Sequence, residues 1–352
     1  MKLWIALISM LLAHVVVLGR DKFFEMDGHH ILLGSVKSFE IPVRSISGDS
    51  TYMPITVING KKEGPVLGLM AGIHGYEYPP IIALQQLVKT IDPASLSGTL
   101  VIVHIANVPA FFGRSVYYNP IDHKNLNRSF PGNQNGTLTD CMAYAISNKI
   151  LPKVDYFIDI HGGDASEDLH PYVGYTVSGT QTEAGKAMAE AMEFDWIMRA
   201  ERKKEVNAPS LYCSQEAIAR DIPTIAIECG KLGVVTPEEV EKINLGLYNV
   251  MRLLKMLSGE VKNSNKAIEF TKRKSIYSEK NGIFYSLHSS GQLIKKDQKI
   301  GYITDLYGNH LQDVISPISG VIVYMIATPP ISKGELLFNL GELPIEFDSS
   351  NI

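Results

Sequence analysis

Continuous apolar runs, separated by short polar turns, dominate the middle of the chain. Runs rich in Val, Ile and Leu predict buried strands, and they occupy residues 66–73, 98–107, 156–163 and 222–230. Between and after them, apolar residues recur at helical spacing, which predicts helices over residues 80–91, 140–151, 182–192 and 236–257. Strands that alternate with helices predict an α/β fold, in which helices flank both faces of a mostly parallel mixed sheet.

The pattern changes towards the C-terminus. Residues 268–341 contain short strand-like runs separated by Gly, Pro and Asp, without helical periodicity. A weak internal repeat relates the segment that begins at Gly282 to the segment that begins at Gly320, because each has a strand, an apolar turn and a second strand. We therefore predict a small all-β domain over residues 268–352, joined by a polar linker at 259–267 to the α/β domain of residues 20–258.

The first nineteen residues have a composition of their own. Lys2 precedes an apolar run from Trp4 to Leu18, and Gly19 follows just before a charged stretch. This layout is typical of a secretory signal peptide, and the run is short for a membrane span. We therefore predict an exported protein, periplasmic or secreted, that is not inserted in a membrane after cleavage. An uncleaved anchor is one alternative, and a buried first helix in a cytoplasmic protein is another.

Composition excludes some functions. The chain has 352 residues, of which 45% are hydrophobic and 20% charged, as in ordinary globular proteins. Its formal net charge of -4 argues against a nucleic-acid partner, because no basic excess exists to neutralise phosphates. The three cysteines, Cys141, Cys213 and Cys229, form no CxxC pair and predict neither a disulfide framework nor a structural zinc site.

Polar residues at the ends of apolar strands are the strongest functional signal. His74, His161 and Glu228 each end a predicted strand, and ligands of α/β proteins bind beyond the carboxyl ends of strands. Catalytic zinc usually takes three protein ligands and keeps one position for water. His74 and Glu77 stand three residues apart in a glycine-rich turn, so with His161 they favour a metal site over a polar loop. Asp159 lies on the same side of its strand as His161 and is predicted to orient it.

Two further features suggest catalysis and substrate binding. Glu228 is a carboxylate in an otherwise apolar strand, so it is either paired or catalytic, and near a metal it would suit a general base. The long segment 107–132 carries Arg114, Asn127 and Arg128. Guanidinium groups bind carboxylates through two hydrogen bonds and stabilise oxyanions, which predicts an acidic substrate. For Glu228 a helix-capping or salt-bridged position is the alternative, and for Arg114 an ordinary surface position.

Four motifs occur in an order that resembles a known family. They are GIHGYE from Gly72, LNRSFPG from Leu126, DIHGGD from Asp159 and IAIECG from Ile225. Together they resemble the succinylglutamate desuccinylase/aspartoacylase family, whose members are relatives of the zinc carboxypeptidases. The resemblance covers roughly residues 40–343 and implies a zinc carboxypeptidase-like fold, followed by a small domain resembling a barrel-sandwich.

The resemblance also implies roles for individual residues. Glu228 would be the general base and proton shuttle, and Arg114 would polarise the scissile carbonyl. Asn127 and Arg128 would grip the substrate carboxylate. One zinc ion per chain would be held by His74, Glu77 and His161.

The implied activity is zinc-dependent hydrolysis of a non-peptide carbon–nitrogen bond. The substrate would be an N-acyl amino acid or a related small amide that bears a carboxylate, attacked by zinc-activated water. One alternative is a zinc carboxypeptidase that acts on short or cell-wall peptides. Another is an inactive relative that binds a metal or a ligand, although an intact set of site residues argues against it.

The C-terminal part resembles the β domain of these proteins, which is itself similar to biotinyl and lipoyl carriers. A carrier presents a lysine on the turn between its two halves, but here that turn reads TDLYGN over residues 304–309. We therefore expect the domain to shape the entrance of the cleft or to assemble subunits. In the second case the protein would form a homo-oligomer.

Overall fold

The computed structural model describes residues 23–201, 209–262 and 267–343. The predicted signal peptide lies outside these residues, so export stays a prediction. Within the described ranges, no helix is both long and apolar enough to cross a membrane. The described part of the chain begins with a small hairpin of β1 (Phe23–Met26) and β2 (His29–Leu32).

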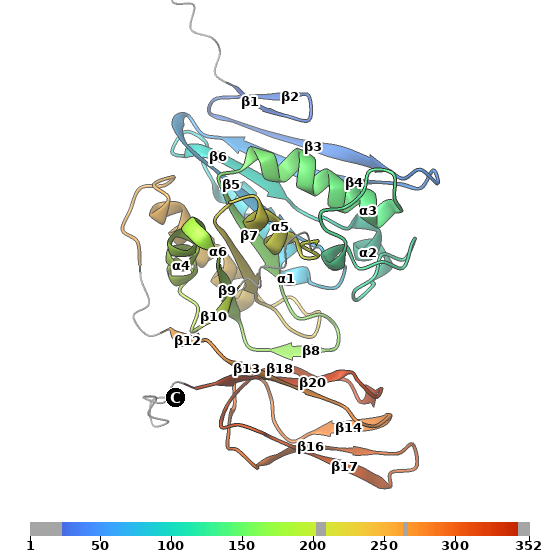
Figure 1. Ribbon diagram of the computed structural model, residues 1–352. Coiled ribbons are helices and arrows are strands. Elements are labelled where there is room, and N and C mark those ends of the chain that lie inside the picture. The colour runs from blue at the N-terminus through green and yellow to red at the C-terminus, as the bar shows by residue number, and fades with distance from the viewer. Residues whose placement is uncertain (1–22, 202–208, 263–266, 344–352) are drawn as a thin grey trace, which may run out of the picture.

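A nine-stranded mixed sheet forms the centre of the larger body (Figure 1). Its order is β12-β10-β9-β11-β7-β5-β6-β4-β3. The pairs β12–β10, β10–β9, β11–β7, β7–β5 and β5–β6 are parallel and the other neighbours are antiparallel, which confirms a mostly parallel mixed sheet. The bounds are β3 (Ser35–Arg44), β4 (Ser50–Asn59), β5 (Lys62–Ala71), β6 (Ser97–Val103), β7 (Tyr156–His161), β9 (Tyr172–Val177), β10 (Trp196–Glu201), β11 (Thr224–Glu228) and β12 (Ile268–Phe270).

Helices cover both faces of this sheet, as predicted. Leu69 on β5 packs in one buried cluster with α1, α4 and α6, whereas its neighbour Met70 packs in a second cluster with α3 and α5. Alternate residues of a strand point to opposite faces, so an apolar run without polar interruptions is what two covered faces require. The bounds are α1 (Tyr78–Thr90), α2 (Val108–Gly113), α3 (Leu138–Ala145), α4 (Thr182–Ala191), α5 (Cys213–Ala219) and α6 (Pro237–Leu253).

The predicted helix over residues 140–151 differs in detail. The regular helix α3 ends at Ala145, and the chain continues as one π turn, η2 (Ile146–Ile150), and a 3₁₀ turn, η3 (Leu151–Lys153). Pro152 lies in η3 and has no N–H to donate, so a regular α-helix cannot continue through this residue. The other short 3₁₀ turns are η1 (Leu126–Arg128) and η4 (Gly179–Gln181).

The C-terminal β region, which we define as residues 273–342, forms two small antiparallel sheets. The predicted repeat is visible in the pairing: β15 of the first half pairs with β18 of the second, and β19 of the second pairs with β14 of the first. Their order is β13-β20-β18-β15 in one sheet and β17-β16-β14-β19 in the other. The bounds are β13 (Arg273–Tyr277), β14 (Gly282–Ser286), β15 (Leu293–Ile294), β16 (Lys299–Thr304), β17 (His310–Ile315), β18 (Gly320–Ile326), β19 (Pro330–Ile331) and β20 (Leu336–Glu342).

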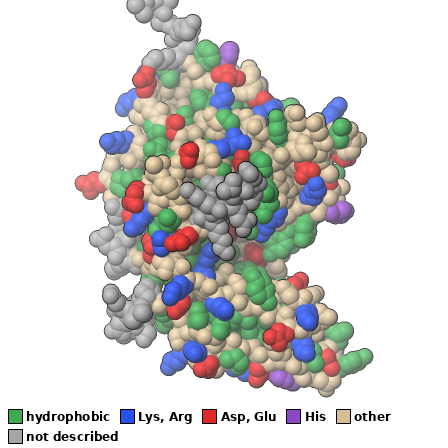
Figure 2. Space-filling view, viewed as in Figure 1, with side chains coloured by type: hydrophobic (Ala, Val, Ile, Leu, Met, Phe, Trp, Pro, Cys, Tyr) green, Lys and Arg blue, Asp and Glu red, His purple; other side chains and the backbone are tan. Residues whose placement is uncertain are grey.

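The first strand after the predicted linker belongs to the large sheet. β12 pairs in parallel with β10, so residues 268–270 extend the sheet edge rather than the C-terminal β region. Phe270 packs in a buried cluster with Trp196 of β10 and with Val321 and Val323 of β18. This apolar seam joins the two parts, and Figure 2 shows that the molecule narrows where they meet.

A short strand from the larger body completes the connection. β8 (Glu167–Leu169) pairs antiparallel with β18 of the C-terminal β region. Within β8, Asp168 is only 8% exposed. Its Oδ1 accepts a hydrogen bond from Ser290 Oγ at 2.8 Å and its Oδ2 accepts one from Ser290 N at 3.1 Å. This buried carboxylate thus adds a polar contact to the apolar seam and the strand pairing that join the two parts.

We expect Asp168→Ala to lower the free energy of unfolding by about 1–3 kcal/mol, because it leaves the Ser290 N–H without its acceptor. Denaturant titration of the full chain measures this difference. Asp313→Ala is the matched control. Asp313 contacts Lys299 at 2.6 Å on the surface, where an ion pair contributes little. Equal stability of wild type and Asp168→Ala would contradict the assigned role.

Candidate metal centre

Three side chains meet at the carboxyl ends of two neighbouring parallel strands. His74 lies in the turn after β5, Glu77 directly precedes α1, and His161 is the last residue of β7. One ligand atom from each residue lies within 4.8 Å of the others, and all three residues are buried. Since β5 pairs with β7, the turn that follows β5 lies beside the end of β7, and two histidines that are 87 positions apart in the sequence come together.

The glycine inside this turn is required by close packing. A Cβ atom at Gly75 would lie 2.1 Å from the carbonyl oxygen of Ala110, in the short helix α2. A side chain here would push the turn away from α2. Gly75 therefore lets the backbone between His74 and Glu77 sit against its neighbour, so that both side chains point into the cluster.

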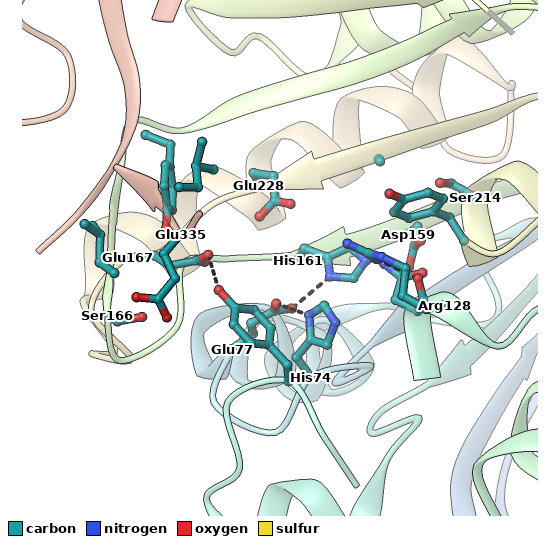
Figure 3. Close-up of a pocket in the computed structure, with 17 residues that line it drawn as sticks. His74, Glu77, Arg128, Asp159, His161, Ser166, Glu167, Ser214, Glu228 and Glu335 are labelled. Carbon is teal, nitrogen blue, oxygen red and sulfur yellow. Dashed lines mark hydrogen bonds and ion pairs between the residues drawn. The ribbon is translucent and has the colours of Figure 1, made fainter. Parts of the chain in front are cut away.

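The carboxylate of Glu77 lies between the two imidazoles (Figure 3). Its Oε1 is 2.5 Å from His74 Nδ1 and its Oε2 is 2.9 Å from His161 Nδ1. The opposite ring nitrogens also face oxygens. His74 Nε2 is 3.2 Å from Asn125 Oδ1, and His161 Nε2 is 3.2 Å from Asp159 Oδ1, close enough for an ion pair though not aligned for a hydrogen bond.

This geometry suits a divalent cation. The oxygen of Asn125 beside His74 Nε2 and the negative charge of Asp159 beside His161 Nε2 favour a proton on each Nε2, which leaves the Nδ1 lone pairs directed at Glu77. The two Nδ1 lone pairs and the Glu77 carboxylate are all rich in electrons and repel one another. A cation between them would therefore stabilise this arrangement. Burial is the largest influence on the pKa of Glu77 and would raise it, but His74 and His161 outweigh it and lower the pKa to about 2. Two imidazole nitrogens and a carboxylate oxygen are the donor set of many catalytic zinc sites.

The charge balance at His161 gives the same indication. Burial, the largest influence, would lower its pKa, yet the carboxylates of Asp159 and Glu77 raise that pKa well above the ordinary value. The site thus attracts a positive charge, whether a proton or a metal ion. This agrees with the predicted orienting role of Asp159, which is itself buried.

Glu228 lies beside the cluster. It is the last residue of β11 and stands opposite His161 in the register of β11 with β7. Burial, with help from Glu77 and Glu167, raises the pKa of Glu228 well above the ordinary value, while His161 opposes the shift. A carboxyl group with a raised pKa can both accept and return a proton near neutral pH.

Asn127 and Arg128 lie on η1 and line the same pocket, which has a volume of about 560 Å³. Asn127 Oδ1 accepts a hydrogen bond from Cys213 N at 2.9 Å, so its amide nitrogen is left to donate. The Arg128 guanidinium lies 4.2 Å from the ring centroid of Tyr212. Within the described part of the chain no carboxylate pairs with Arg128, which leaves the guanidinium available to an anionic ligand.

The structure does not bring Arg114 to this pocket. Arg114 ends α2 in a left-handed conformation, with φ of 48°, and its side chain is exposed. It is absent from the residues that line the pocket. The prediction that Arg114 polarises a substrate carbonyl therefore has no geometric support here, because the local sequence did not indicate the path of the chain after α2.

Several residues of the pocket were not singled out from the sequence. Glu167 accepts a hydrogen bond from Tyr117 Oη at 2.8 Å, and burial, followed by the charge of Asp164, raises its pKa to about 7. Four lining residues come from the C-terminal β region, and only its docking reveals them. The unpredicted residues are Tyr117, Ser166, Glu167, Tyr212, Ser214, Ala226, Tyr324, Ile326, Glu335 and Leu336.

Solved structures with the same fold cover nearly the whole chain. A succinylglutamate desuccinylase from Silicibacter sp. TM1040 is similar with a TM-score of 0.78 and 23% identity, covering 88% of this chain and 95% of that one. The product-bound ectoine utilization protein EutE (DoeB) from Ruegeria pomeroyi has a TM-score of 0.78 and 24% identity, with 87% and 95% covered. These likenesses confirm the α/β fold with a mostly β C-terminal part.

Sequence comparison identifies relatives as well. The chain is 31% identical over 214 residues to an N-alpha-acetyl-L-2,4-diaminobutyric acid deacetylase from Halomonas elongata, a match that covers 60% of this chain and 61% of that relative. Residues 63–254, which include every candidate site residue, match the model of the succinylglutamate desuccinylase/aspartoacylase catalytic domain. The chain belongs to the succinylglutamate desuccinylase/aspartoacylase family.

Proposed function

We propose that this protein is a zinc-dependent hydrolase that cleaves the amide bond of an N-acyl amino acid or of a related small carboxylate-bearing amide. The observation that carries the proposal is the convergence on one pocket of a metal donor set, the Glu228 carboxylate and the Arg128 guanidinium, which pairs with no carboxylate of the described residues. The Halomonas elongata relative, a deacetylase by name, supports amide hydrolysis.

His74, Glu77 and His161 would hold the metal ion. When bound, such an ion polarises a carbonyl group and lowers the pKa of water. Glu228 takes a proton from the attacking water as the water oxygen bonds to the acyl carbon. The carbon–nitrogen bond then breaks, and Glu228 delivers the proton to the leaving amine. The products are a carboxylic acid and a free amino acid.

Arg128 and Asn127 would bind the carboxylate of the substrate. Arg128 has no carboxylate partner within the described residues, and the Asn127 amide nitrogen is oriented by the hydrogen bond that its oxygen accepts from Cys213. A guanidinium fork and an amide donor together match a carboxylate in charge and shape. They hold the amide at a fixed distance from the metal centre.

Arg128→Ala should raise KM for N-acyl amino acids by about 10- to 100-fold, the effect of losing a charge-assisted hydrogen bond. Steady-state kinetics on matched substrates, a carboxylate and its carboxamide analogue, measure the effect. The KM for the carboxamide analogue should change little, because this compound has no carboxylate for Arg128 to bind. Arg44→Ala, at an exposed site outside the pocket, is the control. An equal loss for both substrates would argue against carboxylate binding by Arg128.

The proposed function is tested with zinc-loaded full-length protein and a panel of N-acetyl and N-succinyl amino acids beside short peptides. We expect free amino acids to be released from the N-acylated compounds. Cleavage confined to peptides would favour the carboxypeptidase alternative. Failure to hydrolyse either class with zinc bound would contradict the proposal.

A further inference from the structure

The two histidines of the metal centre contact neighbours of different charge. His161 Nε2 lies 3.2 Å from a carboxylate oxygen of Asp159, whereas His74 Nε2 lies 3.2 Å from the side-chain amide oxygen of Asn125. A carboxylate makes the imidazole that it contacts a stronger metal donor, and a neutral amide does this less. The other contacts of Asn125 explain why an amide occupies this position.

A backbone contact determines how the Asn125 amide is oriented. Asn127 N lies 2.8 Å from Asn125 Oδ1, and a backbone N–H can only donate, so the atom that faces it must be the oxygen. Because that oxygen can only accept, His74 Nε2 must carry the proton in its contact with Asn125. The Asn125 oxygen thus selects the tautomer of His74 that leaves Nδ1 as a donor for the metal.

Asn125 also belongs to the turn to which the proposed function assigns the substrate carboxylate. It is the N-cap of η1, and its backbone oxygen accepts a hydrogen bond from Arg128 N at 3.0 Å. One side-chain oxygen therefore joins the metal ligand His74 to the backbone of the turn that carries Asn127 and Arg128. A negative charge on this side chain would repel a carboxylate bound by the same turn.

We propose that Asn125 is a positioning residue with two functions: its amide oxygen holds the His74 ring for metal binding, and its neutrality preserves the affinity of η1 for the substrate carboxylate. This rests on the proposed function and adds a residue to its site. Aspartate has nearly the same shape and would keep both hydrogen bonds, but its charge would favour the metal ion and disfavour the carboxylate. An amide serves both ligands.

Asn125→Ser separates the contact with His74 from the structure of the turn. Serine is a good N-cap whose hydroxyl can still accept from Asn127 N, but its side chain is one bond shorter and does not reach His74 as well. We expect zinc to bind about 10- to 100-fold more weakly, the usual loss when a residue that orients a metal ligand is removed. Competition with a chelator on the full-length protein measures zinc affinity without turnover.

Asn125→Asp tests the importance of neutrality. Zinc should bind at least as tightly as in the wild type, while KM for an N-acyl amino acid rises by about three- to tenfold through charge repulsion. KM for the carboxamide analogue should change by less than about twofold. A purely structural defect would not change metal and carboxylate affinity in opposite directions. Asn135→Asp adds the same charge at an exposed site outside the pocket and should change neither.

Binding of free L-alanine to zinc-loaded protein, measured by calorimetry, should weaken in Asn125→Asp in the same way and needs no turnover. Wild-type zinc affinity in Asn125→Ser would overturn the role at His74. Unchanged carboxylate affinity in Asn125→Asp, or zinc binding as weak as in Asn125→Ser, would overturn the role of neutrality. These results would leave the proposed function standing. The expected affinities in a protein that hydrolyses no amide would refute the proposed function and leave this inference.

Discussion

Glu228→Gln should lower kcat for an N-acyl amino acid by about 10²- to 10⁴-fold, the range that general acid–base catalysis contributes. Glutamine has the size of glutamate and can still accept a hydrogen bond, but it cannot take a proton from water or deliver one to the leaving amine. The metal content should stay at the wild-type level, since Glu228 lies outside the three-residue donor set.

The pH profile separates loss of proton transfer from a structural effect. A general base works only when ionised, so kcat/KM of the wild type should fall as the pH drops through the pKa of Glu228. Burial raises that pKa, which places the acidic limb above the range of an exposed carboxyl group, and a bound cation moves it back down. The limb should be missing from the residual activity of Glu228→Gln.

The matched control is Glu241→Gln, on the exposed side of α6. It should keep both the turnover and the acidic limb of the wild type. Near-normal turnover of metal-loaded Glu228→Gln would show that another group moves the proton, and the assignment would be wrong.

Much of the candidate site was predictable because its signals are local. His74, His161 and Glu228 each follow or end a run of apolar residues, and parallel strands that run side by side have their carboxyl ends at one edge. The pairing of β7 with both β5 and β11 then brings the three residues together. The ends of the strands can be predicted from the sequence. The order of the strands in the sheet then determines which of these ends are neighbours.

The remaining residues depend on contacts between distant segments. Tyr117 and Arg114 belong to the same long segment, residues 107–132, and only the fold of that segment decides that Tyr117 lines the pocket while Arg114 does not. Glu335 is exposed and follows a glycine in a β-turn, an ordinary surface context. Glu335 reaches the pocket because β8 pairs with β18. No short sequence pattern predicts this pairing.

His161→Ala should remove the metal. One of the three donors disappears, and even changes in residues that only orient a ligand weaken metal binding by about 10- to 100-fold. The loss should therefore exceed that range. Asp159→Asn provides an intermediate case, because it keeps His161 but removes the charge 3.2 Å from its Nε2. We expect this variant to bind zinc more weakly than the wild type and more tightly than His161→Ala.

Elemental analysis of protein purified without chelator measures this directly, and thermal unfolding with and without added zinc measures it independently of activity. A ligand that binds only the folded state raises Tm by mass action, so zinc should raise the Tm of wild type and of the surface control His310→Ala. It should not raise that of His161→Ala. About one zinc per chain in the wild type, lost in His161→Ala, is the expected result. Wild-type protein without stoichiometric metal or a zinc-dependent Tm would contradict the zinc site and, with it, the hydrolase.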